Sequence, residues 1–277
     1  MAMFKYEIIE TAIPSVRGSN IPVTAVIPEV RKPAPLVIYV HGFKAERTEG
    51  GRFLTVAEEL ASRGIFGIMM DQSGCGQSEE PFALYCNDNS LDDIETCISY
   101  MLEKYSVDEN RLTMVGYSNG GRNTAIYIQK GKHQIGTVVL WAAAIIDGFT
   151  FRNFLFDEKD GRDLFEEACE NGVAKYYNAF DNTYIDLSRE FYAGIFNYSA
   201  VKGMKEYQGN VLICHGSADI TVDPQVARDC WNNLTTEKAT ELLIIEGANH
   251  GFGLWDSHME QSKILTDTTE RFILENI

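Results

Sequence analysis

Several features that would point to particular classes of function are scarce or missing in this chain of 277 residues. Basic residues are few, 24 Lys and Arg against 40 Asp and Glu, which gives a net charge of −16. This balance argues against nucleic acid or an anionic membrane as a partner, because phosphate groups are bound by clustered basic side chains. No run of about 18 apolar residues is present, and residues 1–10 are too charged for the apolar part of a signal peptide. We therefore expect a cytoplasmic protein without a membrane span.

Motifs for metals, disulfides and nucleotides are also missing. The six cysteines include no C-x-x-C pair, and several lie in apolar stretches where free thiols commonly pack. The glycine-rich residues 71–78 have neither the G-x-x-x-x-G-K-[ST] nor the G-x-G-x-x-G spacing, so a phosphate-binding loop is the weaker interpretation of this turn. No repeat and no Pro/Ser-rich linker divides the chain. These absences favour one domain with an insertion in a reducing compartment.

The most informative stretch is G-Y-S-N-G at residues 116–120. A serine on a very sharp turn from strand to helix has a strained backbone, and residues without a Cβ are needed beside it. Gly116 and Gly120 occupy those positions, an apolar stretch precedes them and a helical pattern follows. We therefore predict that Ser118 is a nucleophile. The backbone N–H of Asn119, at the start of the helix, is suited to stabilise a developing negative charge.

Apolar β-rich stretches alternate with helical patterns along most of the chain. Residues 4–12 and 21–27 predict an antiparallel pair at a sheet edge. Buried strands are predicted at residues 35–40, 65–70, 112–115, 137–142, 211–214 and 241–245. Helices are predicted at residues 53–63, 122–130, 224–232 and 259–275, and one more is predicted to begin at Ser90 with Asp93 as its capping partner. This alternation indicates an α/β fold with a mostly parallel sheet.

The alternation breaks between residues 147 and 202, where aromatic and acidic residues are frequent. We expect this segment to be an inserted helical cap on a core formed by residues 1–146 and 203–277. A cap rich in aromatic side chains could line a pocket for a flat or acyl group.

A serine nucleophile needs a histidine as its base and a carboxylate to orient that histidine. His250 follows the last predicted strand in a glycine-flanked loop, whereas His41 and His215 precede glycines where such side chains usually brace a turn. Asp219 lies in the turn after the strand at residues 211–214, and Asp223 precedes a proline where a carboxylate usually caps a helix. We therefore predict His250 as the base and Asp219 as the orienting acid.

Taken in order, H-G-F at residues 41–43, the turn at 71–78, the Ser118 elbow, Asp219 and His250 resemble an α/β-hydrolase-fold serine hydrolase. The short H-G-F loop, the D-x-x-G-x-G-x-S turn and the cap most resemble the bacterial feruloyl and cinnamoyl esterase group. The resemblance implies an oxyanion hole made by the N–H groups of Phe43 and Asn119.

The same resemblance implies that an acid and a tyrosine of the cap bind the phenolic end of the acyl chain, with Asp147 and Tyr192 as the nearest matches. Each has a structural alternative, since Asp147 could cap a helix and Tyr192 could lie in the core. The chain departs from the esterase pattern at Ala45, within a longer charged loop at residues 44–52, and at Ser73.

The sequence thus predicts a serine ester hydrolase that forms an acyl-enzyme, needs no cofactor or metal and acts on a small-molecule ester with an aromatic or medium-chain acyl group. A peptidase of the acyl-aminoacyl or prolyl type and a monoacylglycerol lipase are the alternatives among enzymes. A non-catalytic ligand receptor on the same fold is the alternative outside them. A homodimer is possible, but the sequence does not decide it.

Overall fold

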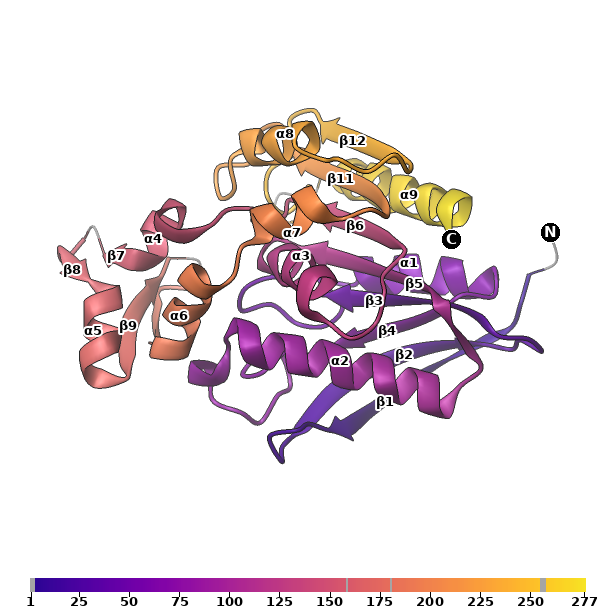
Figure 1. Cartoon of the computed structure of the whole chain (residues 1–277), viewed down its shortest axis with the longest axis horizontal. Helices are drawn as coiled ribbons and strands as arrows, with labels where there is room; N and C mark the ends of the chain where they lie inside the picture. Colours follow the sequence, from indigo (N-terminus) through magenta and orange to yellow (C-terminus); the bar gives the residue numbers. More distant parts are fainter. Residues whose placement is uncertain (1–2, 158, 180, 255–257) are drawn as a thin grey trace.

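An eight-stranded sheet forms the centre of the computed structural model, which describes residues 3–157, 159–179, 181–254 and 258–277 (Figure 1). In sheet order its strands are β1 (Tyr6–Pro14), β2 (Asn20–Pro28), β4 (Phe66–Met70), β3 (Ala34–Val40), β5 (Val107–Tyr117), β6 (Thr137–Trp141), β11 (Asn210–Gly216) and β12 (Thr240–Ile245). β1 pairs antiparallel with β2, and β2 with β4, whereas the remaining pairs are parallel. The predicted antiparallel edge pair and the mostly parallel sheet are therefore confirmed.

Helices cover both faces of the sheet. On one face lie α1 (Arg52–Ser62) and α9 (Met259–Asn276), and on the other lie α2 (Asn87–Lys104), α3 (Asn119–Lys130), α7 (Ala200–Glu206) and α8 (Pro224–Asn232). Each face has its own buried apolar cluster, so the central strands are apolar along their whole length, as parallel strands buried on both faces must be. This arrangement confirms the α/β-hydrolase fold. Within the described ranges, no helix is long and apolar enough to cross a membrane.

The start of α2 differs from the sequence-based prediction. The helix begins at Asn87, and Ser90 already belongs to it, because its N–H donates to the carbonyl of Cys86 at 3.0 Å. Asp93 caps nothing. Its buried carboxylate instead lies 2.8 Å from the guanidinium of the half-buried Arg17, and this ion pair joins the helix to the β1–β2 hairpin. Asp93 therefore forms a tertiary ion pair, whereas the local sequence pattern predicted that it caps the helix.

Residues 147–202 lie beyond one end of the sheet, at the left of Figure 1. The segment contains η2 (Gly148–Phe151), α4 (Arg152–Leu155), β7 (Phe156–Asp157), β8 (Arg162–Asp163), α5 (Leu164–Asn171), β9 (Val173–Asn178), β10 (Thr183–Ser188) and α6 (Arg189–Asn197). It is helical only in part, because β7–β8 and β9–β10 form two antiparallel pairs outside the main sheet. Tyr177 and Tyr184 face each other across β9 and β10 with ring centroids 5.3 Å apart, a cross-strand pair of the kind that stabilises a hairpin.

Candidate active site

Ser118 lies between the end of β5 and the start of α3 with φ 52° and ψ −119°, a strained conformation for a residue with a side chain. The glycines beside it are required by close packing. A Cβ on Gly120 would lie 2.1 Å from the carbonyl oxygen of Val40, and a Cβ on Gly116 would lie 2.5 Å from Oγ1 of Thr124. Because these distances are too short for a side chain, the G-x-S-x-G pattern is a steric condition for this turn.

His250 connects Ser118 to Asp219. Its Nε2 lies 2.9 Å from Oγ of Ser118, and its Nδ1 lies 2.7 Å from Oδ2 of Asp219. The ionised carboxylate can only accept, so Nδ1 carries the proton and Nε2 is left to accept one from the serine hydroxyl. Asp223 does not take part, since its Oδ1 accepts from the N–H of Gln225 at 2.8 Å and caps α8. The structure therefore brings Ser118, His250 and Asp219 together.

Asp219 is held in its charged form by its neighbours. Oδ1 accepts from the N–H groups of Thr221 at 2.8 Å and Val222 at 3.0 Å, and Oδ2 lies 3.1 Å from Nε2 of His215. Burial acts to raise the pKa of Asp219, but the hydrogen bonds from His215 and His250 outweigh it and hold that pKa well below its usual value. A permanently ionised carboxylate is what an imidazole needs in order to keep one tautomer.

The other histidines have separate contacts. Nε2 of His41 accepts from the N–H of Gln72 at 3.0 Å, which ties the H-G-F loop to the glycine-rich turn and is the turn-bracing role expected for this residue. His133 lies 3.3 Å from Glu95 at the far end of α3, and His258 is exposed before α9. None of these contacts involves Ser118.

The backbone around Ser118 offers two N–H groups for an oxyanion. Among the described residues, the N–H of Phe43 has no hydrogen-bond partner. Asn119 is the first residue of α3, where N–H groups have no partner within the helix. Its side chain donates to the hydroxyl of Tyr85 at 2.8 Å and is thereby fixed. These positions agree with the role that the sequence resemblance implies for Phe43 and Asn119.

A cluster of aromatic rings surrounds the side chain of Phe43. Ring centroids 5.0 to 6.1 Å from that of Phe43 belong to Phe82, Tyr85, Phe154, Tyr176 and Phe191. Four of the five pairs are edge-on, the geometry that aromatic quadrupoles favour. The rings come from the loop after β3, from the turn before α2 and from residues 147–202, so this last segment packs directly on the loop that carries Phe43.

The two residues assigned to the phenolic end of a substrate have other surroundings. Both oxygens of Asp147 are engaged, because Oδ1 lies 2.9 Å from the N–H of Ala200 and 3.1 Å from Nη1 of Arg122, and Oδ2 accepts from Ser199 at 2.5 Å. Tyr192 is fully buried, and within the described part of the chain its hydroxyl has no hydrogen-bond partner. The geometry favours the structural alternative for both residues.

The glycine-rich turn at residues 71–78 is folded around its own carboxylate. Asp71 accepts from the N–H of Arg47 at 2.7 Å and from the N–H of Gln77 at 3.0 Å, and it also forms an ion pair with the Arg47 guanidinium at 2.5 Å. A Cβ on Gly76 would lie 2.2 Å from Oδ1 of Asp71. These N–H and guanidinium donors are directed at Asp71 and are therefore not available to a phosphate ligand. The turn supports the site as a scaffold.

Sequence reasoning missed the buried pair of Glu49, in the charged loop after β3, and Arg52, the first residue of α1. Burial raises the pKa of Glu49 to about 7, against the hydrogen bond from the N–H of Gly42 and the charge of Arg52, which act to lower it. The signal in the sequence was the unusual charge of residues 44–52, whose side chains could not be placed without the fold. Tyr85 carried no local signal, since only the folded chain places it beside Asn119.

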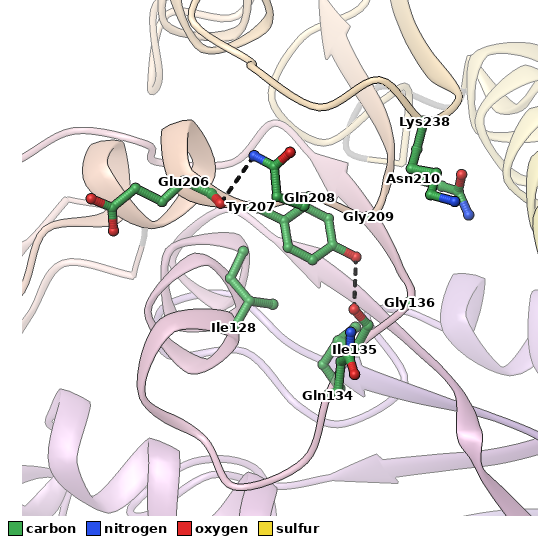
Figure 2. Close-up of a pocket in the computed structure, with 10 residues that line it drawn as sticks. All are labelled: Ile128, Gln134, Ile135, Gly136, Glu206, Tyr207, Gln208, Gly209, Asn210 and Lys238. Carbon is green, nitrogen blue, oxygen red and sulfur yellow. Dashed lines mark hydrogen bonds between the residues drawn. The ribbon is translucent and has the colours of Figure 1, made fainter.

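A hollow lies at the end of the sheet opposite Ser118, where β6 and β11 begin (Figure 2). Its volume is about 480 Å³, and Tyr207 spans it by donating from its hydroxyl to the carbonyl of Ile135 at 3.0 Å. Its lining holds no serine, histidine or cysteine, so it does not repeat the arrangement found at Ser118. Elsewhere in the described residues, no group of three or more His, Cys, Asp and Glu side chains is arranged to hold a metal ion.

Comparison with known proteins gives both a family and a set of similar folds. The family model for the prolyl oligopeptidase family matches residues 52–275. Est1E from Butyrivibrio proteoclasticus, in a structure with bound ferulic acid, superposes with a TM-score of 0.77 at 20% identity over 96% of this chain and 98% of that one. An esterase from Exiguobacterium antarcticum gives 0.64 at 18% identity over 96% and 99%. A putative hydrolase from Agrobacterium vitis S4 gives 0.71 at 20% identity over 96% and 99%.

Proposed function

The chain belongs to the prolyl oligopeptidase family, and from this membership and the contacts of Ser118 we propose that it is a serine ester hydrolase that works through an acyl-enzyme. The observation that carries the proposal is the hydrogen-bonded series from Ser118 through His250 to Asp219. Beside it lie the N–H groups of Phe43 and Asn119, which are oriented by the loop after β3 and by the start of α3.

In the proposed reaction Oγ of Ser118 attacks the ester carbonyl while Nε2 of His250 takes the hydroxyl proton. The negative charge that develops on the carbonyl oxygen is stabilised by the N–H groups of Phe43 and Asn119. His250 then gives its proton to the departing alcohol, and the acyl group remains on Ser118. A water molecule, deprotonated by the same imidazole, releases the acid, while Asp219 keeps the ring oriented in both halves of the cycle.

The aromatic cluster around Phe43 supports an aromatic or medium-chain acyl group as the substrate. Phe43 provides both a backbone N–H for the oxyanion and a ring that packs against Tyr85, Phe154 and Tyr176. An acyl chain bound at Ser118 would extend from this N–H toward those rings. The ferulic acid bound to Est1E is consistent with this class of ligand on the same fold. We take residues 147–202 as the cap that sets acyl preference, and residues 1–146 and 203–277 as the core.

The proposal is tested with a fluorophosphonate probe and with the variant Ser118→Ala. The probe is expected to label the wild type and not the variant, and the variant is expected to lose about 10⁴- to 10⁶-fold in kcat without unfolding, as coupled triads do. A panel of acetyl, butyryl and hydroxycinnamoyl esters is expected to rank the hydroxycinnamoyl and butyryl esters above acetyl. Full ester hydrolysis by Ser118→Ala would refute the mechanism, and a wild type that neither reacts with the probe nor turns over any substrate would favour a ligand receptor.

A peptidase is the second candidate, and the name of the matched family favours it. The same panel therefore includes acyl-aminoacyl and prolyl anilides. Amides have a poorer leaving group than esters, so faster turnover of any of these anilides than of every ester would assign the site to peptide bonds. A preference for long-chain monoacylglycerols over both classes would indicate a lipase.

A further inference from the structure

Two buried charges lie at the start of α1 and just before it, and each contacts one of the loops that carry Phe43 and His250. Glu49 is 5% exposed and Arg52 is 4% exposed, and their side chains form an ion pair at 3.4 Å. Replacing a buried ion pair by apolar side chains often leaves a protein as stable or more stable, so stability alone gives little reason for this one. The contacts that Glu49 and Arg52 each make outside the pair give a more specific reason for its presence.

Glu49 holds the loop that carries Phe43. Its Oε1 accepts the N–H of Gly42 at 2.8 Å, one residue before the proposed oxyanion donor. The backbone of Glu49 has φ 50°, in the left-handed region that residues with a Cβ normally avoid. Gly50 and Gly51, which follow, are also left-handed but are glycines. A glutamate kept in this conformation indicates that its side chain is needed at this position.

Arg52 holds the loop that carries His250. Its Nη1 donates to the carbonyl of Gly251 at 2.7 Å, one residue after the proposed base. Its guanidinium also lies 5.2 Å from the ring centroid of Tyr117, whose hydroxyl donates to the carbonyl of His250 at 3.0 Å. Arg52 therefore meets the His250 loop directly and also through the residue that precedes Ser118.

We propose that Glu49 and Arg52 are a positioning pair that fixes the loop carrying Phe43 and the loop carrying His250 relative to each other. This inference rests on the proposed ester hydrolase mechanism. Through the pair, the N–H of Gly42 and the carbonyl of Gly251 are joined by a continuous series of contacts. Neither side chain touches Ser118 or a substrate, so each acts through the backbone that it holds.

The pair is expected to affect the rate more than substrate binding. The oxyanion exists only in the transition state and in the tetrahedral intermediate, so a displaced Phe43 N–H weakens interactions that the bound ester does not yet make. A displacement of about 1 Å in such a site can cost on the order of 100-fold in rate. A purely structural pair would instead lower the melting temperature and leave kcat of the folded protein unchanged.

The test measures kcat, KM and the melting temperature of Glu49→Leu, Glu49→Gln and Arg52→Met on one good ester. Assays at about pH 8.5 keep Glu49 ionised in the wild type, because its pKa is about 7. We expect Glu49→Leu and Arg52→Met to lower kcat by about 10- to 100-fold with KM changed less than about 3-fold. Glu49→Gln keeps an acceptor for the N–H of Gly42 and is expected to recover most of the rate.

The matched control is Asp93→Asn on α2, which removes another buried carboxylate that is paired with an arginine, since it lies 2.8 Å from Arg17. It is expected to lower the melting temperature without lowering kcat. If Glu49→Leu and Arg52→Met behave like this control, with reduced stability and unchanged kcat, the positioning role is wrong. Should Glu49→Leu fail to fold, Arg52→Met decides, and an unchanged kcat in this variant would overturn the inference. A wild type without ester hydrolysis would overturn the proposed function itself, and the inference with it.

Discussion

Nε2 of His215 lies 3.1 Å from Oδ2 of Asp219, the same oxygen that lies 2.7 Å from Nδ1 of His250. One carboxylate oxygen is therefore shared by two buried imidazole rings. His215 also contacts the carbonyl of Val222 at 2.9 Å, so it supports the turn that carries Asp219 as well as the carboxylate itself. Because the pKa of Asp219 is lowered despite burial, its charge is retained across the pH range in which an esterase would work.

Substitution of the two candidate acids separates an orienting carboxylate from a helix cap. Asp219→Asn is expected to lower kcat by about 10⁴-fold, because the amide no longer holds His250 in the required tautomer. Asp223→Asn keeps a side chain that can cap α8 and is expected to cost at most about 1 kcal/mol in the free energy of unfolding, with kcat near that of the wild type. Steady-state kinetics and thermal unfolding of both variants provide the measurement. An inactive Asp223→Asn beside an active Asp219→Asn would reverse the assignment.

Conservative changes at two tyrosines distinguish a substrate contact from core packing. Tyr192→Phe removes a buried hydroxyl that has no partner in the described part of the chain, so the variant is expected to be equally stable or about 1 kcal/mol more stable, with unchanged KM for every ester. Tyr85→Phe removes the acceptor of the Asn119 side chain and is expected to lower kcat several-fold for all esters.

The measurements for the tyrosines are KM and kcat on hydroxycinnamoyl and alkyl esters of the same alcohol. A rise in KM of about 2- to 12-fold for Tyr192→Phe, confined to hydroxycinnamoyl esters, would restore Tyr192 as the residue that binds the phenol.

Stability is expected to fall between about pH 4.5 and pH 7 because of Glu270 on α9. Burial raises the pKa of this carboxyl to about 7, with smaller contributions from Glu59 and Asp267. Between the unfolded and folded pKa values the folded state binds more protons than the unfolded state, so the free energy of unfolding decreases as the pH rises through this window. Glu270→Gln removes the contribution of this carboxyl, whereas that of Glu49, whose pKa is also raised to about 7, remains. Since the side chain of Glu270 is only half-buried, the expected gain at pH 8 is about 1 kcal/mol, with almost none at pH 4.5.

Thermal unfolding of the Glu270→Gln variant at both pH values checks this expectation. Glu237→Gln, which changes an exposed carboxylate near β12, is the control and is expected to match the wild type at both. A gain for Glu270→Gln that is equal at the two pH values would show that protonation of Glu270 is not its cause.

Part of the architecture follows from the local sequence. The apolar stretches of the sheet and the helices that alternate with them could be predicted, because strands buried on both faces must be apolar throughout and surface helices must be apolar along one side. The elbow at Ser118 could also be predicted, because its G-x-S-x-G pattern lies within five positions, although the carbonyl that excludes a side chain at Gly120 belongs to Val40 of β3. The prediction failed at Ser90, where a plausible capping pattern lies inside a helix and Asp93 pairs with Arg17 from a distant hairpin.

The sequence by itself determined the alternation of strands and helices, the elbow at Ser118 and the glycine-flanked loop of His250, because the pattern that indicates each of them lies within a few consecutive positions. The tertiary structure decided what surrounds these elements. It placed Glu49 and Arg52 between two loops that are about 200 residues apart in the chain, and it buried Tyr192. Burial and pairing of such side chains depend on which distant segments pack together. The spacing of residue types along the chain does not contain that information.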